Sequence, residues 1–283
     1  MRSAKRYLAL LLALCLLFLP SCRWFQRAPA VEDGFLVITF LDVGQGDAIL
    51  LQTTDGAILI DAGTERSEED LILRLKALGI SSLSLFVMTH PDADHIGGAD
   101  GVINAFSIDE VWYSGSPSTG KAAERMERAL DAADLEAKVV TRGTTYELDA
   151  LEILVLSPVT PTNDTNASSV VLLVSFGETD LLLMGDADKK VEASILKSYP
   201  ADRLDCEILK AGHHGSKTAS SMAFLEVTTP EYTVISCGAG NSYGHPHGEV
   251  LDRLEKVGSE VLRTDLSGSI TIKTDGNTMS VDK

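Results

Sequence analysis

The sequence predicts a layered α/β protein that contains two sheets. Three short apolar runs broken by Gly and Asp come first in the chain. Further strand-like runs then alternate with segments whose apolar residues recur at helical spacing, and the chain ends in strand-like runs. This order is typical of two sheets with helices packed against them. With 283 residues, 45% of them hydrophobic and 23% charged, the chain is long and apolar enough to bury a large core.

The first 22 residues, MRSAKRYLALLLALCLLFLPSC, differ from the rest. Three basic residues precede an apolar run over 7–19, which is the order of a secretory signal. The run is shorter than the about 20 apolar residues that span a bilayer. We therefore expect 1–21 to be a signal peptide and the protein to be exported. LPSC also resembles the lipobox of bacterial lipoproteins, which implies a lipid on Cys22 and a membrane-anchored protein facing outside the cytoplasm; a plainly cleaved signal and an uncleaved anchor are the alternatives.

The charge balance is strongly acidic. Loss of Arg2, Lys5 and Arg6 with the signal would change the formal net charge from −17 to −20. Such a surface repels polyanions at long range, which counts against sequence-independent binding along a nucleic acid. A local cationic site made by bound metal ions remains compatible with this charge.

A short tether over 22–34 precedes one domain over 35–283, because no linker or repeat divides the remainder. The helix predicted over 67–80 has Ser67 as its N-cap and Gly79 as its stop. The last segment, over 269–283, reads as a hairpin that turns at 275–277. The other predicted helices are 120–135, 189–199, 220–227 and 247–258, and the predicted strands are 35–43, 47–53, 57–63, 83–89, 110–115, 145–158, 168–177, 179–186, 206–212 and 232–238.

The segment HPDADH holds four ligand-type residues in six positions, directly after a buried strand. They are His90, Asp92, Asp94 and His95. Neutral imidazole and carboxylate are normal ligands of zinc and manganese. A polar surface loop with a helix cap is the alternative, but the density of ligand-type residues favours a metal-binding loop.

Several motifs carry a resemblance to a known family. THPDADHIGG resembles the HxHxDH signature of the metallo-β-lactamase superfamily. FLDVGQGDAILL, MGDAD, LKAGHHGSKTASS and SYGHPHGEVLDRL resemble the metallo-β-lactamase-like domain of ComEC-type DNA-uptake competence proteins, in the same order over roughly 36–275. The resemblance implies an αββα sandwich of two mixed sheets flanked by helices, and a hydrolase that uses one or two zinc or manganese ions.

The resemblance also implies a ligand set. The HxHxDH positions are followed by a bridging carboxylate, Asp186, and by a late histidine, which is His213 or His214 with His213 favoured. In one arrangement a first metal binds His90, Asp92 and Asp186. The second then binds Asp94, His95, Asp186 and His213.

Residues around the ligands are implied as well. Asp61 matches an early aspartate that supports the metal loop, and Asp47 is expected to orient a ligand, with a tight hairpin as the alternative role of its turn. The family's middle histidine has no counterpart, so Asn166 or Ser169 would stand in its place. The expected catalytic residues are Asp94, together with His245 or Lys217 in contact with the scissile group.

Some of these residues have simpler interpretations. Asp186 could instead cap the following helix, or Asp186 and Asp188 could share the two roles. His247 is expected to flank the final helix. Cys206 and Cys237 could pair outside the cytoplasm, but lone buried thiols are favoured because the chain has no dense cysteine framework.

Three functions follow from this reading. The first is an exported phosphodiesterase or nuclease that acts on DNA or another phosphodiester, with competence-type membrane proteins as partners. The second is a hydrolase of lactones or β-lactams, and the third is a non-catalytic metal-binding surface lipoprotein. Asp92 favours the first, because a carboxylate in place of an imidazole shifts a site toward manganese or a mixed-metal preference.

Overall fold

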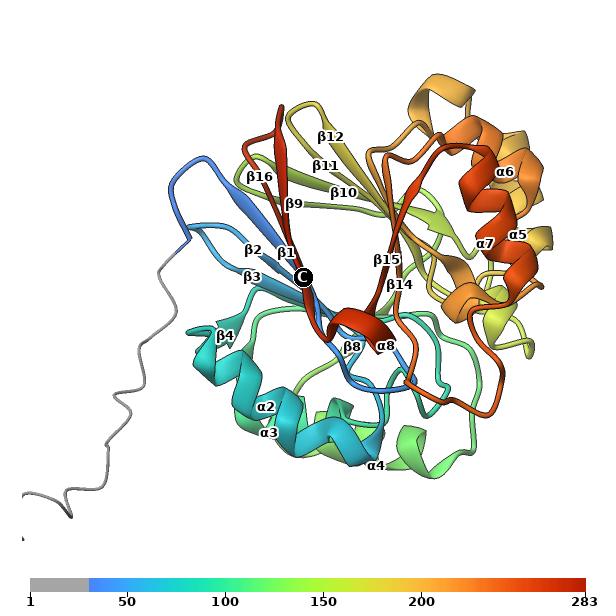
Figure 1. The fold of residues 1–283 in the computed structure, drawn as a ribbon. Coiled ribbons are helices and arrows are strands. Elements are labelled where there is room, and N and C mark those ends of the chain that lie inside the picture. Colours follow the sequence, from blue (N-terminus) through green and yellow to red (C-terminus); the bar gives the residue numbers. More distant parts are fainter. Residues whose placement is uncertain (1–30) are drawn as a thin grey trace, which may run out of the picture.

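The computed structural model describes residues 31–283, so the predicted signal peptide and Cys22 lie outside the described residues. Two large mixed sheets pack face to face, and helices cover the outer face of each (Figure 1). This arrangement confirms the αββα sandwich. None of the helices in 31–283 is long and apolar enough to cross a membrane.

The first sheet has the strand order β17-β16-β1-β2-β3-β5-β7-β8. It is antiparallel from β17 to β3 and parallel from β3 to β8, and the C-terminal hairpin adds to it beside β1. Its strands are β1 (Leu36–Phe40), β2 (Ile49–Gln52), β3 (Ala57–Ile60), β5 (Leu85–Met88), β7 (Val111–Tyr113), β8 (Ala137–Val139), β16 (Ile270–Thr274) and β17 (Met279–Asp282).

The second sheet has the strand order β15-β14-β13-β12-β11-β10-β9. It is antiparallel from β9 to β12 and parallel from β12 to β15. Its strands are β9 (Thr145–Leu148), β10 (Leu151–Ser157), β11 (Val171–Phe176), β12 (Thr179–Leu183), β13 (Ile208–Lys210), β14 (Tyr232–Ile235) and β15 (Glu260–Arg263). A separate two-stranded pair joins β4 (Ser82–Leu83) and β6 (Ser107–Ile108).

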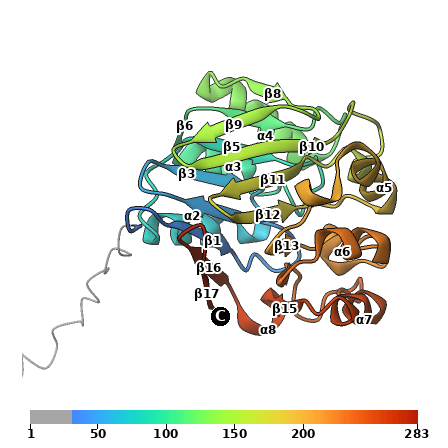
Figure 2. The same cartoon turned by 90° about the horizontal axis from the view of Figure 1, so that it is seen from above.

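Helices cover the two outer faces. Helices α2 (Glu68–Ala77), α3 (Ala99–Ala105) and α4 (Lys121–Ala133) lie on the first sheet, and α5 (Lys189–Ser198), α6 (Met222–Thr228) and α7 (Gly248–Lys256) on the second. Figure 2 shows α5, α6 and α7 in a row along the outside of the second sheet. The short elements are α8 (Thr264–Ser267) and the 3-10 turns η1 (Glu65–Ser67), η2 (Asn166–Ser168), η3 (Ala201–Arg203) and η4 (Gly212–Gly215).

Strand β11 shows how the layers form. Leu172 and Val174 pack into the core between the sheets, whereas Val171 and Leu173 pack under α5 and α6. Successive side chains of a strand point to opposite faces, so a strand buried on both faces reads as one continuous apolar run. Cys206 and Cys237 lie in the outer core of this sheet as buried free thiols, as expected.

Candidate metal centre

The site lies where strands of both sheets end. The HPDADH loop follows β5, Asp186 follows β12, and His213 and His214 follow β13. Side chains at strand ends leave the sheet and can meet without disturbing its hydrogen bonds. The packing of the two sheets therefore brings together residues that are more than a hundred positions apart in the chain.

Buried hydrogen bonds fix both histidines of the loop. Asp61 Oδ2 accepts from Thr89 Oγ1 and from His95 Nδ1, each at 2.7 Å. Because the Thr89 hydroxyl proton points to Asp61, its oxygen accepts from His90 Nδ1 at 3.0 Å. Both Nδ1 atoms are therefore the protonated ring nitrogens, and both Nε2 atoms face inward with a free lone pair when the rings are neutral. Asp61 thus has the supporting position expected of it.

The two adjacent histidines of η4 sit on left-handed backbone, with φ of 49° at His213 and 53° at His214. This conformation costs energy in a non-glycine residue and points to a functional constraint. It sends the two rings in different directions. His214 is buried and its Nδ1 donates to the Ser236 carbonyl at 2.9 Å, while the His213 side chain stays 27% exposed.

The carboxylate of Asp186 stands between two groups of ligand-type atoms. Its Oδ1 lies 3.2 Å from His95 Nε2 and 3.5 Å from His214 Nε2. Its Oδ2 lies 3.8 Å from His90 Nε2 and 3.6 Å from His213 Nε2. Each oxygen of one buried carboxylate therefore faces its own pair of histidines.

Each loop aspartate joins one of these groups. Asp94 Oδ2 is 3.5 Å from His214 Nε2, and Asp92 Oδ2 is 3.8 Å from His90 Nε2. The Oδ1 group consists of Asp94, His95, His214 and Asp186 Oδ1. The Oδ2 group consists of His90, Asp92, His213 and Asp186 Oδ2.

The Oδ1 group has the dimensions of a metal site. Four ligand atoms held tetrahedrally at about 2.1 Å from an ion lie roughly 3.4 Å apart. The separations of 3.2 to 3.5 Å at His95, His214 and Asp186 agree with this value. Among the described residues, Asp186 Oδ1 is also buried without a hydrogen-bond partner, and so is His90 Nε2 of the Oδ2 group. The donor set and its unpartnered atoms fit a bound cation.

Protonation compensates part of this charge in the ion-free protein. Burial lowers the pKa of His214, but the carboxylates of Asp186 and Asp47 outweigh it and raise the pKa to about 9. His95 follows the same balance, with Asp186 and Asp61 raising its pKa well above the usual range. Burial together with the neighbouring His95 lowers the pKa of His90 to about 3. Protons on His95 and His214 thus supply positive charge where an ion would bind.

Asp47 also belongs to the cluster but acts from behind the rings. It comes within 4.8 Å of His95, Asp186 and His214. However, its oxygens approach the Nδ1 atoms, at 3.4 Å for His214 and 4.0 Å for His95, rather than the inward Nε2 atoms. Lys210 Nζ, fully buried, lies 2.7 Å from its Oδ2. Asp47 therefore lies behind the rings of two expected ligands, and Lys210 is a partner that the sequence pattern did not predict.

The turn that carries Asp47 depends on glycine. A Cβ on Gly46 would lie 2.3 Å from the Asp94 carbonyl oxygen, and φ at this position is +145°. The amide of Asp47 donates to the same carbonyl at 3.2 Å. Gln45 Oε1 accepts from the Gly238 amide at 3.2 Å and so joins this turn to the second sheet.

Ser169 occupies the region where the middle histidine would be. Its Oγ lies 3.5 Å from His90 Nδ1 and accepts from the Asp186 amide at 3.1 Å. Asn166 opens η2, and its Oδ1 is buried without a hydrogen-bond partner in the described chain. Burial raises the pKa of the Asp92 carboxyl, and the nearby Thr165 of that region acts in the opposite direction. Ser169 is thus in contact with the site, and no contact of Asn166 with it is seen.

Of the remaining residues considered from the sequence, His245 lies at the site, whereas Lys217, Asp188 and His247 do not line it. His245 lines a pocket of about 120 Å³ over the metal residues, and burial with the nearby His214 lowers its pKa to about 4. Lys217 is exposed and is not part of that lining. Asp188 caps α5 by accepting from the amides of Lys190 and Val191, which leaves Asp186 to the site. His247 stands at the N-cap position of α7, as expected.

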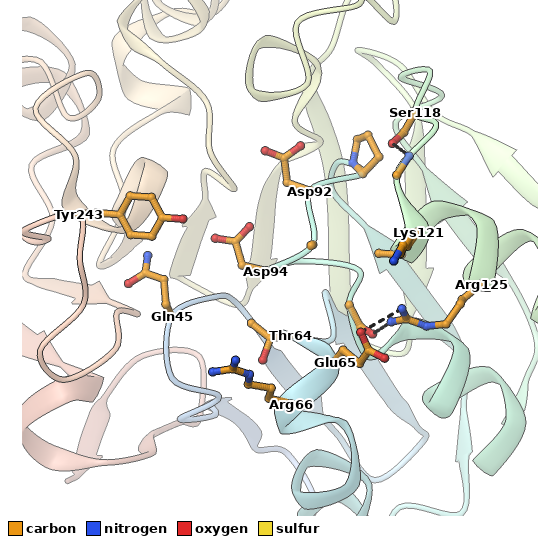
Figure 3. Close-up of a pocket in the computed structure, with 15 residues that line it drawn as sticks. Gln45, Thr64, Glu65, Arg66, Asp92, Asp94, Ser118, Lys121, Arg125 and Tyr243 are labelled. Carbon is orange, nitrogen blue, oxygen red and sulfur yellow. Dashed lines mark hydrogen bonds and ion pairs between the residues drawn. The ribbon is translucent and has the colours of Figure 1, made fainter.

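A larger cleft of about 760 Å³ opens beside this pocket (Figure 3). The pocket and the cleft share Gln45, Asp92, Asp94 and Tyr243. The metal loop therefore forms one wall of a continuous depression.

The sequence model that describes the metallo-beta-lactamase superfamily matches residues 41–239. This range includes the whole HPDADH loop, Asp186 and both histidines of η4. The chain belongs to the metallo-beta-lactamase superfamily. This finding confirms the family resemblance and implies a metal-dependent hydrolase with a candidate metal site.

Similar proteins within the superfamily carry competence-related names. The chain is 36% identical over 248 residues to Competence protein ComA of Neisseria gonorrhoeae, a match that covers 86% of this chain and 33% of that protein. It is 32% identical over 255 residues to ComE operon protein 3 of Bacillus subtilis, covering 82% and 32%. The chain thus spans about a third of the length of the curated relatives it matches.

Solved structures of other proteins share the fold. The protein YhfI of Bacillus subtilis aligns with a TM-score of 0.55 at 9% identity, covering 87% of this chain and 100% of YhfI. CmlA of Streptomyces venezuelae, described as a diiron β-hydroxylase, aligns with a TM-score of 0.57 at 13% identity, covering 87% and 55%. At such identities the likeness supports the fold alone.

Proposed function

We propose that this protein is an exported, metal-dependent phosphodiesterase. The observation that carries the proposal is the position of Asp186, with one carboxylate oxygen facing each of two histidine and aspartate groups. A carboxylate shared between two ions is the usual bridge of dinuclear hydrolytic sites. His213 lies near Oδ2 and His214 near Oδ1. This supports both adjacent histidines as ligands, one for each group, rather than only one of them.

Ions held by these groups would supply positive charge at the reacting centre and a water that is nucleophilic near neutral pH. The chain's own residues prepare the site. Asp61 accepts from His95 Nδ1 directly and orients His90 through the Thr89 hydroxyl, and the Ser236 carbonyl accepts from His214 Nδ1. The Nε2 atoms of these three histidines therefore converge on Asp186. Preorganised ligands of this kind need no rearrangement when the substrate binds.

His245 is the proposed contact to the substrate. Its ring lines the pocket, and its Nδ1 is buried without a partner among the described residues. Since its pKa is about 4, the ring is neutral at pH 7 and would act through a hydrogen bond to a phosphoryl oxygen rather than as a cation. Lys217, exposed and outside the pocket lining, has no role in this proposal.

The carboxylates favour a phosphodiester and manganese. The two groups contain Asp92 and Asp94 in addition to Asp186, so hard oxygen donors make up much of the ligand set. Carboxylate ligands suit manganese, whereas imidazole ligands suit zinc. Two ions held close together would stabilise both the attacking and the leaving oxygen of a displacement at phosphorus.

Export and anchoring rest on the sequence of residues 1–22. We infer that the signal is removed and that Cys22 carries lipid, which would hold the enzyme on a membrane facing outside the cytoplasm, where competence-type membrane proteins could be partners. Mass spectrometry of the mature N-terminus tests this inference. An unmodified N-terminal residue other than Cys22 would rule out the lipoprotein.

An activity panel tests the enzymatic proposal. The protein is loaded with manganese or zinc and offered bis(p-nitrophenyl) phosphate, single-stranded DNA, a lactone and a β-lactam, with Asp94→Asn as the inactive control. We expect hydrolysis of the diester and of DNA only. Cleavage restricted to the lactone or the β-lactam would replace the proposal by the small-substrate hydrolase. Bound metal without any hydrolysis would support the non-catalytic lipoprotein.

A further inference from the structure

The cleft of about 760 Å³ beside the metal loop plays no part in the proposed hydrolysis of a small diester. It is lined by Thr64 to Arg66 of the η1 turn, by the metal loop and by the start of α4. Because it shares Asp92, Asp94 and Tyr243 with the pocket over the metal residues, a ligand held at one place can extend into the other. Its volume of about 760 Å³ exceeds what a single small diester fills.

Two uncommitted cations line this cleft in a chain of net charge −17. Arg66 and Lys121 are exposed, and neither makes an ion pair or a side-chain hydrogen bond within 31–283. Figure 3 shows the carboxylates of Asp92 and Asp94 between Lys121 and Tyr243, and Arg66 beside Thr64; both carboxylates belong to the metal groups. Bound ions would offset those negative charges.

Arg125 also lines the cleft but is fully engaged. Its guanidinium pairs with Asp100 and with Glu65, at 3.2 and 3.1 Å. It also donates to the Gly97 carbonyl at 2.6 Å, so it ties α4 to the end of the metal loop. Its single positive charge is shared between Asp100 and Glu65, so it offsets only part of the charge of Glu65, the other carboxylate in the cleft, and it fixes the wall that carries Lys121.

The start of α4 adds to the positive wall. Gly120 stands at the N-cap of this 13-residue helix and provides no side-chain cap, while its own amide donates to Ser118 Oγ at 3.1 Å. Gly120, Lys121 and Ala122 line the cleft. Unpaired amides at such an end attract anions.

Tyr243 stands at the junction of pocket and cleft. It is 63% exposed, and its ring stacks on His245 with centroids 5.6 Å apart and an interplanar angle of 21°. Figure 3 shows Tyr243 on the side of Asp94 opposite to Lys121. An exposed ring held by stacking is a suitable platform for a flat base.

We propose that this cleft is a second phosphate subsite, in which Arg66, Lys121 and the start of α4 hold the phosphate next to the scissile diester of an oligonucleotide. The base beside that diester stacks on Tyr243. The subsite rests on the proposed phosphodiesterase function for its position beside the reacting centre.

Two labelled 12-mers test the subsite, one of thymidylate and one with abasic sugars throughout. For the metal-loaded protein, kcat/KM for each 12-mer is divided by kcat/KM for bis(p-nitrophenyl) phosphate. Arg66→Ala with Lys121→Ala should lower both ratios at least about ten-fold. The matched control, Lys197→Ala with Lys256→Ala on α5 and α7, removes the same charge away from the cleft and should leave them unchanged.

Binding of phosphorothioate versions of the 12-mers, which resist hydrolysis, to the metal-loaded protein is followed by fluorescence anisotropy and gives a readout independent of turnover. The slope of log K against log salt should become smaller by about 0.7 in the double variant, since the single phosphate held by Arg66 and Lys121 contributes about 0.7 on a single strand. Tyr243→Ala should weaken only the thymidylate 12-mer, and Tyr243→Phe should restore it.

The outcomes separate the subsite from the reaction. Equal ratios and equal slopes in the two double variants would overturn the subsite even if diesters are cleaved. An equal loss of both 12-mers in Tyr243→Ala would overturn the stacking of a base. If nothing is hydrolysed but the salt slopes differ as expected, the phosphodiesterase fails while the anion subsite stands.

Discussion

His95 and His214 meet at their Nε2 atoms, 3.2 Å apart, although they lie 119 positions apart in the chain. Both rings use Nδ1 as a donor to an acceptor behind them, the Asp61 carboxylate and the Ser236 carbonyl. Two neutral rings held in this way would oppose two lone pairs. The contact is therefore stable only with a cation or a proton between the rings, and it links metal binding to pH.

Metal-free protein should lose stability as the pH rises from about 6.5 to about 9. The folded-state pKa of His214, raised to about 9, lies above the ordinary 6.5 of an unfolded histidine. Its contribution is therefore fully present below 6.5 and is lost as the pH rises through 9. Thermal unfolding in the presence of a chelator measures this loss, with His247→Ala as a control that should keep it. A flat profile over that range would exclude protonated His214.

The affinity for metal should rise with pH, whereas the stability of the metal-free protein should fall. An ion must displace the protons from His95 and His214, so its apparent affinity should rise over the same range and protons should be released. Calorimetric titration of manganese in two buffers with different ionisation enthalpies counts those protons. An affinity independent of pH would mean that the ion binds elsewhere.

Replacement of His213 and of His214 should remove different ions. His213→Ala weakens the Oδ2 group and should leave one ion bound, whereas His214→Ala should release the ion of the Oδ1 group. The expected loss of affinity is at least about 100-fold for the affected ion, since a direct ligand contributes more than the outer partners worth 10–100-fold. Elemental analysis after dialysis gives the stoichiometry. Loss of the same ion in both variants would contradict the two groups.

Asp92→His should raise the preference for zinc over manganese. The change replaces a hard carboxylate oxygen, 3.8 Å from His90 Nε2, by an imidazole nitrogen. Competition between the two metals, with the bound fractions measured by elemental analysis, is the test. Unchanged selectivity would count against Asp92 as a ligand.

Lys210→Met should destabilise the protein by about 3–5 kcal/mol, because it leaves Asp47 as a buried charge without its partner. Adding Asp47→Leu should recover most of that loss, since an apolar pair can replace a buried ion pair at little cost. Urea unfolding of the single and double variants measures both steps. The exposed Lys256→Met serves as control and should lower the free energy of unfolding only slightly. If Lys210→Met lowers it no more than this control does, the Lys210–Asp47 pair contributes nothing to stability.

The sequence predicted the elements that have strong local patterns. Helices α4 and α7 bury a regular apolar stripe, and β11 and β12 are continuous apolar runs. The strands β8 and β15 were missed because they are edge strands with few buried residues, and their pairing depends on distant neighbours. The seven-residue α3, with a glycine inside it, has too little periodicity to be recognised.

Some residues of the site were likewise predictable from local sequence, and others were not. The HPDADH loop shows itself by the density of ligand-type residues, and Asp186 by its place at a strand end. The positions of His213 and His214 could not be assigned from sequence, because two adjacent residues on left-handed backbone point in different directions. Lys210 gave only a weak signal, a lysine inside an apolar strand, and Arg66 and Tyr243 gain their positions from tertiary packing alone.

The most direct test of the enzymatic proposal is the rate of bis(p-nitrophenyl) phosphate hydrolysis as manganese is titrated into wild-type protein and into Asp186→Asn. The expected result is a rate that requires metal, saturates with it, and falls at least about 100-fold in a variant that still unfolds cooperatively. A wild-type protein that binds the metal but hydrolyses no diester, or an Asp186→Asn variant as active as wild type, would contradict it.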